Sequence, residues 1–370
     1  MDRFRYSSYA QEVIFAPGAI AQVSDAVERF GWQRLLLCTN HSMQVYGNVD
    51  LLQSVLGDRI VATFDQVQPH VQDIQVDQVL GLALEHEIEA VMGLGGGSPI
   101  GMAKAVAYAL EPSIPIIAIP TTYAGSEMTA VYGITHSRES PPRKVTVNDS
   151  KIVPKLVIYD PELTLDLPPE MTASTGINAL AHCIEALYSV TRHPFSTAAA
   201  IQGVTYISNS LLSCYQNGKN LEARTEMLTG AHLAGLSLAS VSMGLHHGLC
   251  HVLGGTANVP HGIANSIILP HAIRFNADVT APQLLPAAEA MRIPFNGSSP
   301  QLVMEAMVQK ISDLIAQMNL PQRLSDAGVA LKETDLPHLA HLAFQNRTVQ
   351  NNPKPITDVA QLESLLRGAW

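Results

Sequence analysis

A chain of 370 residues, 47% of them hydrophobic, is long enough to form two packed domains without disulfide support. Its formal net charge is −10 and its 22 Lys and Arg residues are scattered, which argues against a nucleic acid or membrane partner and favours a small molecule. We expect a cytoplasmic protein, because the start lacks an apolar signal segment, no apolar run reaches the about 18 residues of a membrane span, and the four cysteines show no CxxC spacing.

Short apolar runs alternate with longer amphipathic stretches in the first half of the chain. Continuous apolar runs bounded by turn residues are typical of strands that are covered on both faces of a sheet. Their alternation with helices predicts a doubly wound parallel sheet, and so a dinucleotide-binding α/β domain over residues 1–160. The predicted strands are "RLLLCTN" at 34–40, "VATFD" at 61–65, "AVMGLGGG" at 90–97, "IPIIAIPTT" at 114–122 and "KLVIYD" at 155–160.

From about Asp160 onward the pattern changes to long Ala- and Leu-rich segments with helical periodicity. We therefore expect an all-helical domain over residues 161–370, with the boundary in the proline-rich stretch "YDPELTLDLPPEM". Breaks between helices are predicted at "LPPEM", "RHPFS", "VPHG", "LPHAI" and "NNPKP".

A glycine-rich turn lies between a predicted strand and a helix that begins near Pro99, in "MGLGGGSPIGMAKAVAYAL". Glycines let the backbone approach a diphosphate closely, and the following helix N-terminus offers free N–H groups to the anion. The stretch departs from GxGxxG, so a tight turn without a ligand remains an alternative. The predicted cofactor-binding residues here are Gly95, Gly96, Gly97 and Ser98.

A second loop, "IPTTYAGSEMT" at 119–129, also follows a predicted strand and is rich in hydroxyl groups. Ligands of open α/β sheets bind at the carboxyl ends of strands, so Thr121, Thr122 and Ser126 are predicted to line the same crevice, unless this is a plain connecting loop.

Asn40 ends another strand where such proteins often place an acidic residue against the ribose. A neutral Asn predicts weak discrimination between NADH and NADPH, although a simple turn residue is the alternative.

Histidines are clustered in the helical half. Asn178 and His182 are spaced i,i+4 and share one helix face, His247 and His251 repeat that spacing, and His261 follows in a "PHG" turn. A lone histidine is usually a hydrogen-bonded core residue, but several converging ones suggest chemistry. Three imidazoles could hold Zn²⁺ or Fe²⁺, or could act without a metal as hydrogen-bond donors and a general acid.

These motifs give the chain a resemblance to the iron-containing alcohol dehydrogenase superfamily, and within it to the maleylacetate reductases. The resemblance covers nearly the whole chain and follows the order of the family's motifs. They are "VIFAPGAI", "GGGSPIGMAK", "PTTYAGSEMT", "GINALAHCIEALYS", "HGLCHVLGG" and "PHGIANSIILPH". The resemblance implies a dehydroquinate synthase-like architecture and an NAD(P)H-dependent oxidoreductase.

The family's metal ligands map onto Asn178, His182, His247 and His261, and His251 matches an extra histidine near the nicotinamide. Metal-dependent members have aspartate at the first of these positions, and an acid where Gly101 stands in this chain. Both departures resemble maleylacetate reductases. From the missing aspartate we expect no metal, and we expect the four histidines to be catalytic.

The implied reaction is the reduction of the conjugated C=C bond of maleylacetate to give 3-oxoadipate, a step in the breakdown of aromatic compounds. Charge developing on an enolate oxygen would be stabilised by imidazole donors, with His251 or His247 as proton donor. The dicarboxylate substrate needs cations, hydroxyls or amides. Predicted substrate-binding residues are Tyr123, Asn178, Lys144 and Arg347, with Ser126 and Lys354 as further candidates.

Two other interpretations stay open at the level of sequence. The first is a metal-dependent (Fe or Zn) alcohol dehydrogenase for a small alcohol or aldehyde, in which Asn178 or water replaces the carboxylate. The second is a catalytically inactive dinucleotide-binding module that acts as a sensor. The presence of both loops and the full histidine cluster argues against it, because a sensor would need no proton donors. The family resemblance also implies a homodimer.

Overall fold

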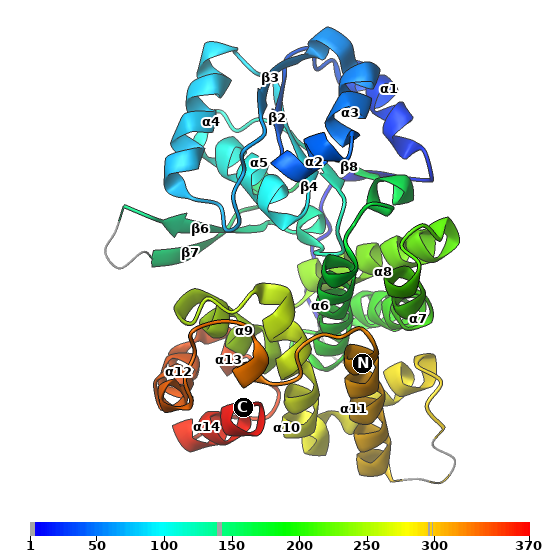
Figure 1. Cartoon of the computed structure of the whole chain (residues 1–370), viewed down its shortest axis with the longest axis vertical. Coiled ribbons are helices and arrows are strands. Elements are labelled where there is room, and N and C mark those ends of the chain that lie inside the picture. Colours follow the sequence, from blue (N-terminus) through cyan, green and yellow to red (C-terminus); the bar gives the residue numbers. More distant parts are fainter. Residues whose placement is uncertain (1–3, 139–142, 295–296, 298) are drawn as a thin grey trace. The chain divides into compact units, whose positions relative to one another are not determined.

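The computed structural model describes residues 4–138, 143–294, 297 and 299–370. Its chain folds into two compact units. One is formed by Ser8–Leu167, and the other by Pro168–Trp370 together with the N-terminal residues up to Ser7. The predicted fold class is confirmed, because the first unit contains a parallel six-stranded sheet with helices and the second is helical (Figure 1).

The α/β unit is built on a sheet in which every neighbouring pair of strands is parallel. All five predicted strands are present. The order across the sheet is β1 (Glu12–Phe15), β8 (Leu156–Tyr159), β5 (Ile116–Pro120), β4 (Ala90–Gly95), β2 (Leu35–Cys38) and β3 (Ile60–Phe64). The chain winds outward from β2 to β3 and in the opposite sense from β4 to β5, so the direction of winding reverses between β2 and β4.

Successive residues of β2 point to opposite faces of the sheet and enter two separate cores. Leu35 and Leu37 join the core under α1 (Val23–Phe30) and α3 (Asn48–Leu56), whereas Leu36 and Cys38 join the core under α4 (Asp73–Glu85) and α5 (Gly97–Ala109). All four are fully buried, which explains why the run is apolar throughout instead of alternating. The helices of this unit are α1 (Val23–Phe30), α2 (His41–Val45), α3 (Asn48–Leu56), α4 (Asp73–Glu85) and α5 (Gly97–Ala109).

Three strands of this unit are not apparent in the sequence pattern. β1 is a short edge strand whose residues are only partly buried, so it lacks the continuous apolar signal of the central strands. The antiparallel hairpin of β6 (Val131–His136) and β7 (Arg143–Asn148) lies outside the main sheet. Short 3₁₀ turns complete the unit at Ala19–Gln22, Gly57–Arg59, Ser126–Met128, Ser150–Ile152 and Pro161–Thr164.

The second unit is all-helical in its described residues. Gly203 of α7 (Pro194–Gln216) is one of the positions at which two helices approach closely, because a Cβ there would lie 2.6 Å from the Cys183 sulfur of α6 (Pro169–Tyr188). Two 3₁₀ turns lie at Leu324–Asp326 and Glu333–Asp335. The helices are α6 (Pro169–Tyr188), α7 (Pro194–Gln216), α8 (Leu221–Ser240), α9 (Leu245–Thr256), α10 (His261–Ala290), α11 (Pro300–Gln317), α12 (Leu336–Gln345), α13 (Arg347–Gln350) and α14 (Val359–Gly368).

Helix α10 corrects the break predicted at "LPHAI". It continues through Pro270, Pro282 and Pro286, although an interior proline costs about 3 kcal/mol through the lost hydrogen bond and a steric clash. The apolar residues around Pro270 are buried, and α10 packs against α6, α9 and α11. Tertiary burial therefore outweighs the local preference. His261 is also the first residue of this helix and does not lie within a turn.

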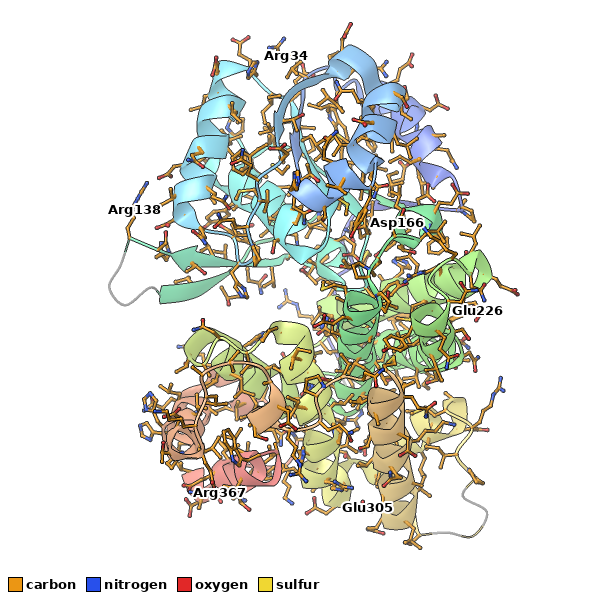
Figure 2. All side chains as sticks on the ribbon, viewed as in Figure 1. Arg34, Arg138, Asp166, Glu226, Glu305 and Arg367 are labelled. Carbon is orange, nitrogen blue, oxygen red and sulfur yellow. The ribbon has the colours of Figure 1, made fainter. Side chains whose placement is uncertain are left out.

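Most charged side chains lie at the surface (Figure 2). Arg367 pairs with Glu363 at 2.8 Å and with Glu333 at 2.9 Å, and Arg138 pairs with Asp77 at 2.7 Å. Exposed pairs of this kind contribute only about 0–1 kcal/mol each. Among the described residues no single helix has the length and apolar composition to cross a bilayer, and the one pair that meets the criterion jointly, α8 with α9, is bent by 95°.

Candidate active site

The predicted phosphate loops meet at one edge of the α/β sheet, at the reversal between β2 and β4. The Thr39 hydroxyl, after β2, donates to the Leu94 carbonyl at 2.9 Å, and the Thr121 N–H, after β5, donates to the Gly95 carbonyl at 3.0 Å. A Cβ on Gly96 would lie 3.1 Å from Thr122 Cγ2. The structure thus brings Asn40, Gly95, Gly96, Gly97, Ser98, Thr121 and Thr122 to the place where open α/β sheets bind ligands.

The glycine turn leaves a helix N-terminus open. Helix α5 begins at Gly97, before the expected Pro99, and its N-cap residue Gly96 makes no side-chain capping bond. Gly95 has a φ of 136°, a conformation that favours glycine. Uncapped N–H groups at this end can bind a phosphate group. Asn40 is only partly buried, and its amide oxygen accepts a hydrogen bond from the Ser42 hydroxyl at 2.8 Å.

Lys104, which sequence analysis missed, anchors the second loop from inside α5. Its fully buried ammonium donates to the carbonyls of Ser126 (2.6 Å), Thr129 (2.8 Å) and Val131 (2.9 Å). Burial lowers the pKa of Lys104 to about 7, while the nearby carboxylate of Glu127 opposes the shift. A lysine on an otherwise apolar helix face, just after the glycine turn, was the available signal. Its contacts hold the loop that contains Ser126 against α5.

Gly101 occupies a crowded position in the second turn of α5. A Cβ there would lie 2.9 Å from Cγ2 of the buried Val71. Val71 therefore fills the space next to the helix into which a side chain at position 101 would extend. Of the predicted substrate-binding residues in this unit, Tyr123 is fully buried, whereas the side chain of Lys144, on β7, lies outside the described residues.

The four predicted catalytic histidines do come together in the helical unit. The rings of His182 on α6 and His247 on α9 are stacked with centroids 4.6 Å apart, and both side chains are buried. His251 and His261 are exposed, and their rings are stacked at 5.9 Å. The His247 ring lies 6.2 Å from that of His261 and 6.4 Å from that of His251. Buried Asn178 lies one helical turn before His182 on the same face of α6.

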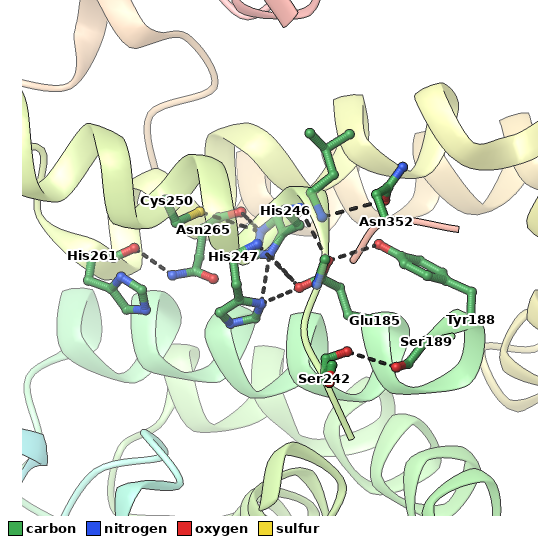
Figure 3. A network of polar contacts seen from close by, with 12 residues as sticks. Glu185, Tyr188, Ser189, Ser242, His246, His247, Cys250, His261, Asn265 and Asn352 are labelled. Carbon is green, nitrogen blue, oxygen red and sulfur yellow. Dashed lines mark hydrogen bonds and ion pairs between the residues drawn. The ribbon is translucent and has the colours of Figure 1, made fainter. Parts of the chain in front are cut away.

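A buried carboxylate behind these rings was also missed. Glu185 lies three residues after His182, on the same face of α6. Its Oε2 accepts a hydrogen bond from His247 Nδ1 at 2.5 Å, and its carboxylate also accepts from the backbone N–H groups of Gly244, His246 and His247 (Figure 3). The Asn178, His182 and Glu185 spacing of i, i+4 and i+7 was the signal that could have revealed it.

Burial determines the protonation state of the inner imidazoles. It holds the pKa of His182 and of His247 well below the ordinary histidine range, and the neighbouring imidazoles lower both further. Burial also raises the pKa of Glu185. The nearby His246 ring and the three backbone N–H donors oppose this shift. Both inner imidazoles are therefore neutral at neutral pH, the state in which a histidine ligates a metal.

The remaining predicted residues lie on the C-terminal segment of the same unit. Arg347 is exposed at the start of α13 and forms no ion pair in the part of the chain that the structure describes. The short helix packs on α9 through Gly248, where a Cβ would lie 2.4 Å from Val349 Cγ2. By contrast, the Lys354 ammonium is already 3.0 Å from the Asp278 carboxylate and lies over the Phe275 ring.

Comparisons with known proteins identify the class. Residues 10–161 match the model of iron-containing alcohol dehydrogenase, and residues 172–370 match the C-terminal model of the Fe-containing alcohol dehydrogenase family. The chain therefore belongs to the iron-containing alcohol dehydrogenase family of oxidoreductases. Its similarity to maleylacetate reductases places it in that group of the family.

The full-length relatives support this placement. The chain is 35% identical to the maleylacetate reductase of Pseudomonas knackmussii over 367 residues, covering 99% of this chain and 97% of that protein. A maleylacetate reductase crystal structure from Agrobacterium tumefaciens superposes with a TM-score of 0.88 at 31% identity, covering 100% and 99% of the chains. A 1,3-propanediol oxidoreductase structure gives a TM-score of 0.94 at 29% identity, with full coverage of both.

The expectation that no metal is bound is wrong. The family whose models match is an iron-containing one, and buried ring nitrogens of His182 and His247 have no hydrogen-bond partner in the described structure. The mistake lay in treating a missing aspartate as the loss of the whole site. Neutral imidazoles bind iron without help from an acidic residue at position 178.

The residues present fit a metal ion on the other side of the His247 ring. Three of the buried side-chain atoms that have no hydrogen-bond partner in the described structure belong to this cluster: Asn178 Oδ1, His182 Nδ1 and His247 Nε2. Glu185 Oε2 and His247 Nδ1, at 2.5 Å, are hydrogen-bonded to each other and so are not two ligands of one ion. The carboxylate instead supports the histidine from behind, as outer residues of metal sites do.

Proposed function

We propose that the protein is a maleylacetate reductase, which uses NADH or NADPH to reduce the conjugated C=C bond of maleylacetate and gives 3-oxoadipate. The observation that carries the proposal is the full-length similarity to maleylacetate reductases combined with an amide, Asn178, beside three clustered histidines. The proposed role lies in the breakdown of aromatic compounds.

The reaction is a hydride addition followed by protonation. Hydride from the reduced nicotinamide adds to the alkene carbon remote from the ketone, the C=C electron pair moves to form an enolate, and the carbon next to the ketone then takes a proton. The products are 3-oxoadipate and NAD(P)⁺. Fixed hydrogen-bond donors and cations near the ketone oxygen lower the barrier, because negative charge develops there.

The histidine cluster divides into two kinds of position. His182, His247 and His261, with the amide oxygen of Asn178, would hold the iron, which supplies Lewis-acid polarisation of the ketone oxygen when bound. Buried His247 stays neutral because its pKa lies well below the ordinary range, so at neutral pH it is not the doubly protonated imidazolium that would act as a general acid. Exposed His251 is therefore the better proton donor of the two candidates.

The α/β unit would bind the cofactor. The open N-terminus of α5 and the hydroxyl-rich loop after β5 suit a diphosphate. Asn40 is uncharged, so it repels a 2′-phosphate less than an aspartate would. We expect activity with both NADH and NADPH.

Substrate recognition requires groups for two carboxylates. Arg347 has a planar guanidinium that suits bidentate carboxylate binding, and it is exposed without an acidic partner in the described structure. The other predicted substrate contacts are Tyr123, Lys144 and Asn178.

The family resemblance also supports a homodimer. The four free cysteines suit a reducing compartment such as the cytoplasm.

Isotope transfer tests the reaction directly. The purified protein is incubated with freshly generated maleylacetate and NADH carrying deuterium at C4, and the product is examined by NMR. We expect 3-oxoadipate with deuterium on the former alkene carbon remote from the ketone, which is two bonds from the ketone carbon and next to a carboxylate. A hydroxy acid with deuterium on the former carbonyl carbon would contradict the proposal and indicate an alcohol dehydrogenase.

A further inference from the structure

A chain of buried polar groups lies behind the histidine cluster and belongs to α6, α9 and α10 (Figure 3). Glu185, fully buried, receives hydrogen bonds from three backbone N–H groups and from His247 Nδ1. His246, also fully buried, connects the carboxylate region to the backbone of Asn265. This chain determines where the protons of two adjacent histidines lie.

The proton of His246 can be assigned from its partners. His246 Nε2 lies 3.1 Å from the backbone carbonyl oxygen of Asn265. A carbonyl oxygen can only accept, so Nε2 carries the hydrogen, and in the neutral ring Nδ1 has the lone pair. That lone pair lies 3.2 Å from Nδ1 of His247.

The proton of His247 then follows. Its Nδ1 faces two acceptors, the Glu185 carboxylate at 2.5 Å and the His246 Nδ1 lone pair at 3.2 Å. Nδ1 must therefore carry the hydrogen, which leaves the lone pair on Nε2. Nε2 is the buried atom that has no partner in the described structure, and its ring is stacked on His182.

We propose that Glu185, together with the Asn265 carbonyl acting through His246, fixes the tautomer of His247 so that Nε2 is a preformed metal ligand. The proposal rests on the metal site described above. Glu185 is a positioning residue, because it touches neither substrate nor cofactor. The same protons exclude a cation from the group formed by Glu185, His246 and His247, since the ring nitrogens there are occupied by hydrogen bonds.

The first test reads the tautomer in the metal-free wild-type protein. Histidine is labelled with ¹⁵N, and long-range ¹H–¹⁵N correlation spectra assign the protonated nitrogen of each ring. We expect His247 protonated on Nδ1 and His246 on Nε2. Protonation of His247 on Nε2 would overturn the proposal. This measurement uses no substrate, so its outcome is independent of whether the protein reduces maleylacetate.

The second test changes the carboxylate. In Glu185→Gln the amide can donate toward His247 Nδ1, which drives the proton to Nε2, where it competes with a metal ion. Co²⁺ affinity, measured by competition with a chromophoric chelator, is expected to fall about 10–100-fold. The ¹⁵N spectrum should show the Nε2–H form. Circular dichroism and the unfolding temperature confirm that the variant is folded.

Tyr188→Phe is the matched control. The Tyr188 hydroxyl donates to Glu185 Oε1 at 3.5 Å, the limit of a hydrogen bond, and it does not contact His247 through any interaction in the described structure. We expect this variant to keep the tautomer and the Co²⁺ affinity of the wild type. Equal losses in both variants would show a general packing effect and would overturn the positioning role, as would unchanged affinity in Glu185→Gln. If Glu185→Gln does not fold, the wild-type tautomer decides the question.

Discussion

The imidazole rings of His182 and His247 lie face to face, with centroids 4.6 Å apart and planes within 14° of parallel. They come from different helices, α6 and α9, and each has a buried nitrogen without a hydrogen-bond partner in the described residues. Unpaired buried polar atoms are costly, by about 1–3 kcal/mol each. A bound cation would satisfy both, which is why the pair indicates a metal site.

Asn178→Asp should strengthen metal binding. The carboxylate adds a negative charge where the native amide offers only a neutral oxygen, and the side chain is similar in shape. We expect the dissociation constant for Co²⁺ or Zn²⁺ to fall at least about tenfold, equivalent to about 1.4 kcal/mol. Asn217→Asp, at an exposed position of the same unit, is the control and should leave it unchanged. No gain in Asn178→Asp would mean that residue 178 does not face the ion.

Arg347→Gln should weaken substrate binding. Loss of the guanidinium removes a charge-assisted pair with a substrate carboxylate, so KM for maleylacetate should rise about tenfold or more, with a smaller change in kcat. Steady-state kinetics at saturating NADH measure this. Arg323→Gln removes an exposed arginine elsewhere in the unit and should have the wild-type KM. Indistinguishable kinetics for the two variants would remove Arg347 from the site.

Lys104→Met should impair the cofactor loop. The ammonium holds the carbonyls of Ser126, Thr129 and Val131, and a thioether cannot replace these hydrogen bonds. We expect KM for NADH to rise about tenfold, corresponding to about 1.4 kcal/mol, while KM for maleylacetate changes less. Lys151→Met, at an exposed position of the same unit, is the control. Equal changes in both KM values would indicate general loss of structure instead.

His232 should make the protein less stable in acid. Burial lowers the pKa of His232 to about 4, below the ordinary histidine value of 6.5. Between these values the unfolded chain binds a proton that the folded chain does not, so the free energy of unfolding falls as pH drops from 6.5 to about 4. The contribution approaches about 1 kcal/mol per pH unit. Urea unfolding of His232→Gln should show a shallower fall over this range, and parallel curves would refute the assignment.

Prediction from sequence succeeded where local pattern and burial agree. The apolar runs of β2 and β4 report burial on both faces, and the i,i+4 spacing on α6 and α9 brings Asn178 with His182 and His247 with His251. It failed where tertiary packing overrides local preference. Pro270 lies inside a buried helix for that reason, and the edge strand β1 has too few buried residues to be recognised.

The supporting residues of the site were harder to predict than its histidines. Glu185 and Lys104 lie in apolar helices, and each has partners distant in sequence: His247 lies 62 residues after Glu185, and Thr129 lies 25 residues after Lys104. A pattern with helical periodicity locates the face of a residue but not its partner on another element. The expected absence of a metal failed for the same reason, because the buried lone pairs become visible only in three dimensions.

Metal dependence of maleylacetate reduction is the most direct test of the account. The purified enzyme is analysed for iron, and NADH oxidation with freshly generated maleylacetate is followed before and after exhaustive treatment with a strong chelator. Turnover is expected to be lost with the metal and to return when Fe²⁺ is added. Undiminished turnover in protein shown to be free of iron and zinc would contradict it.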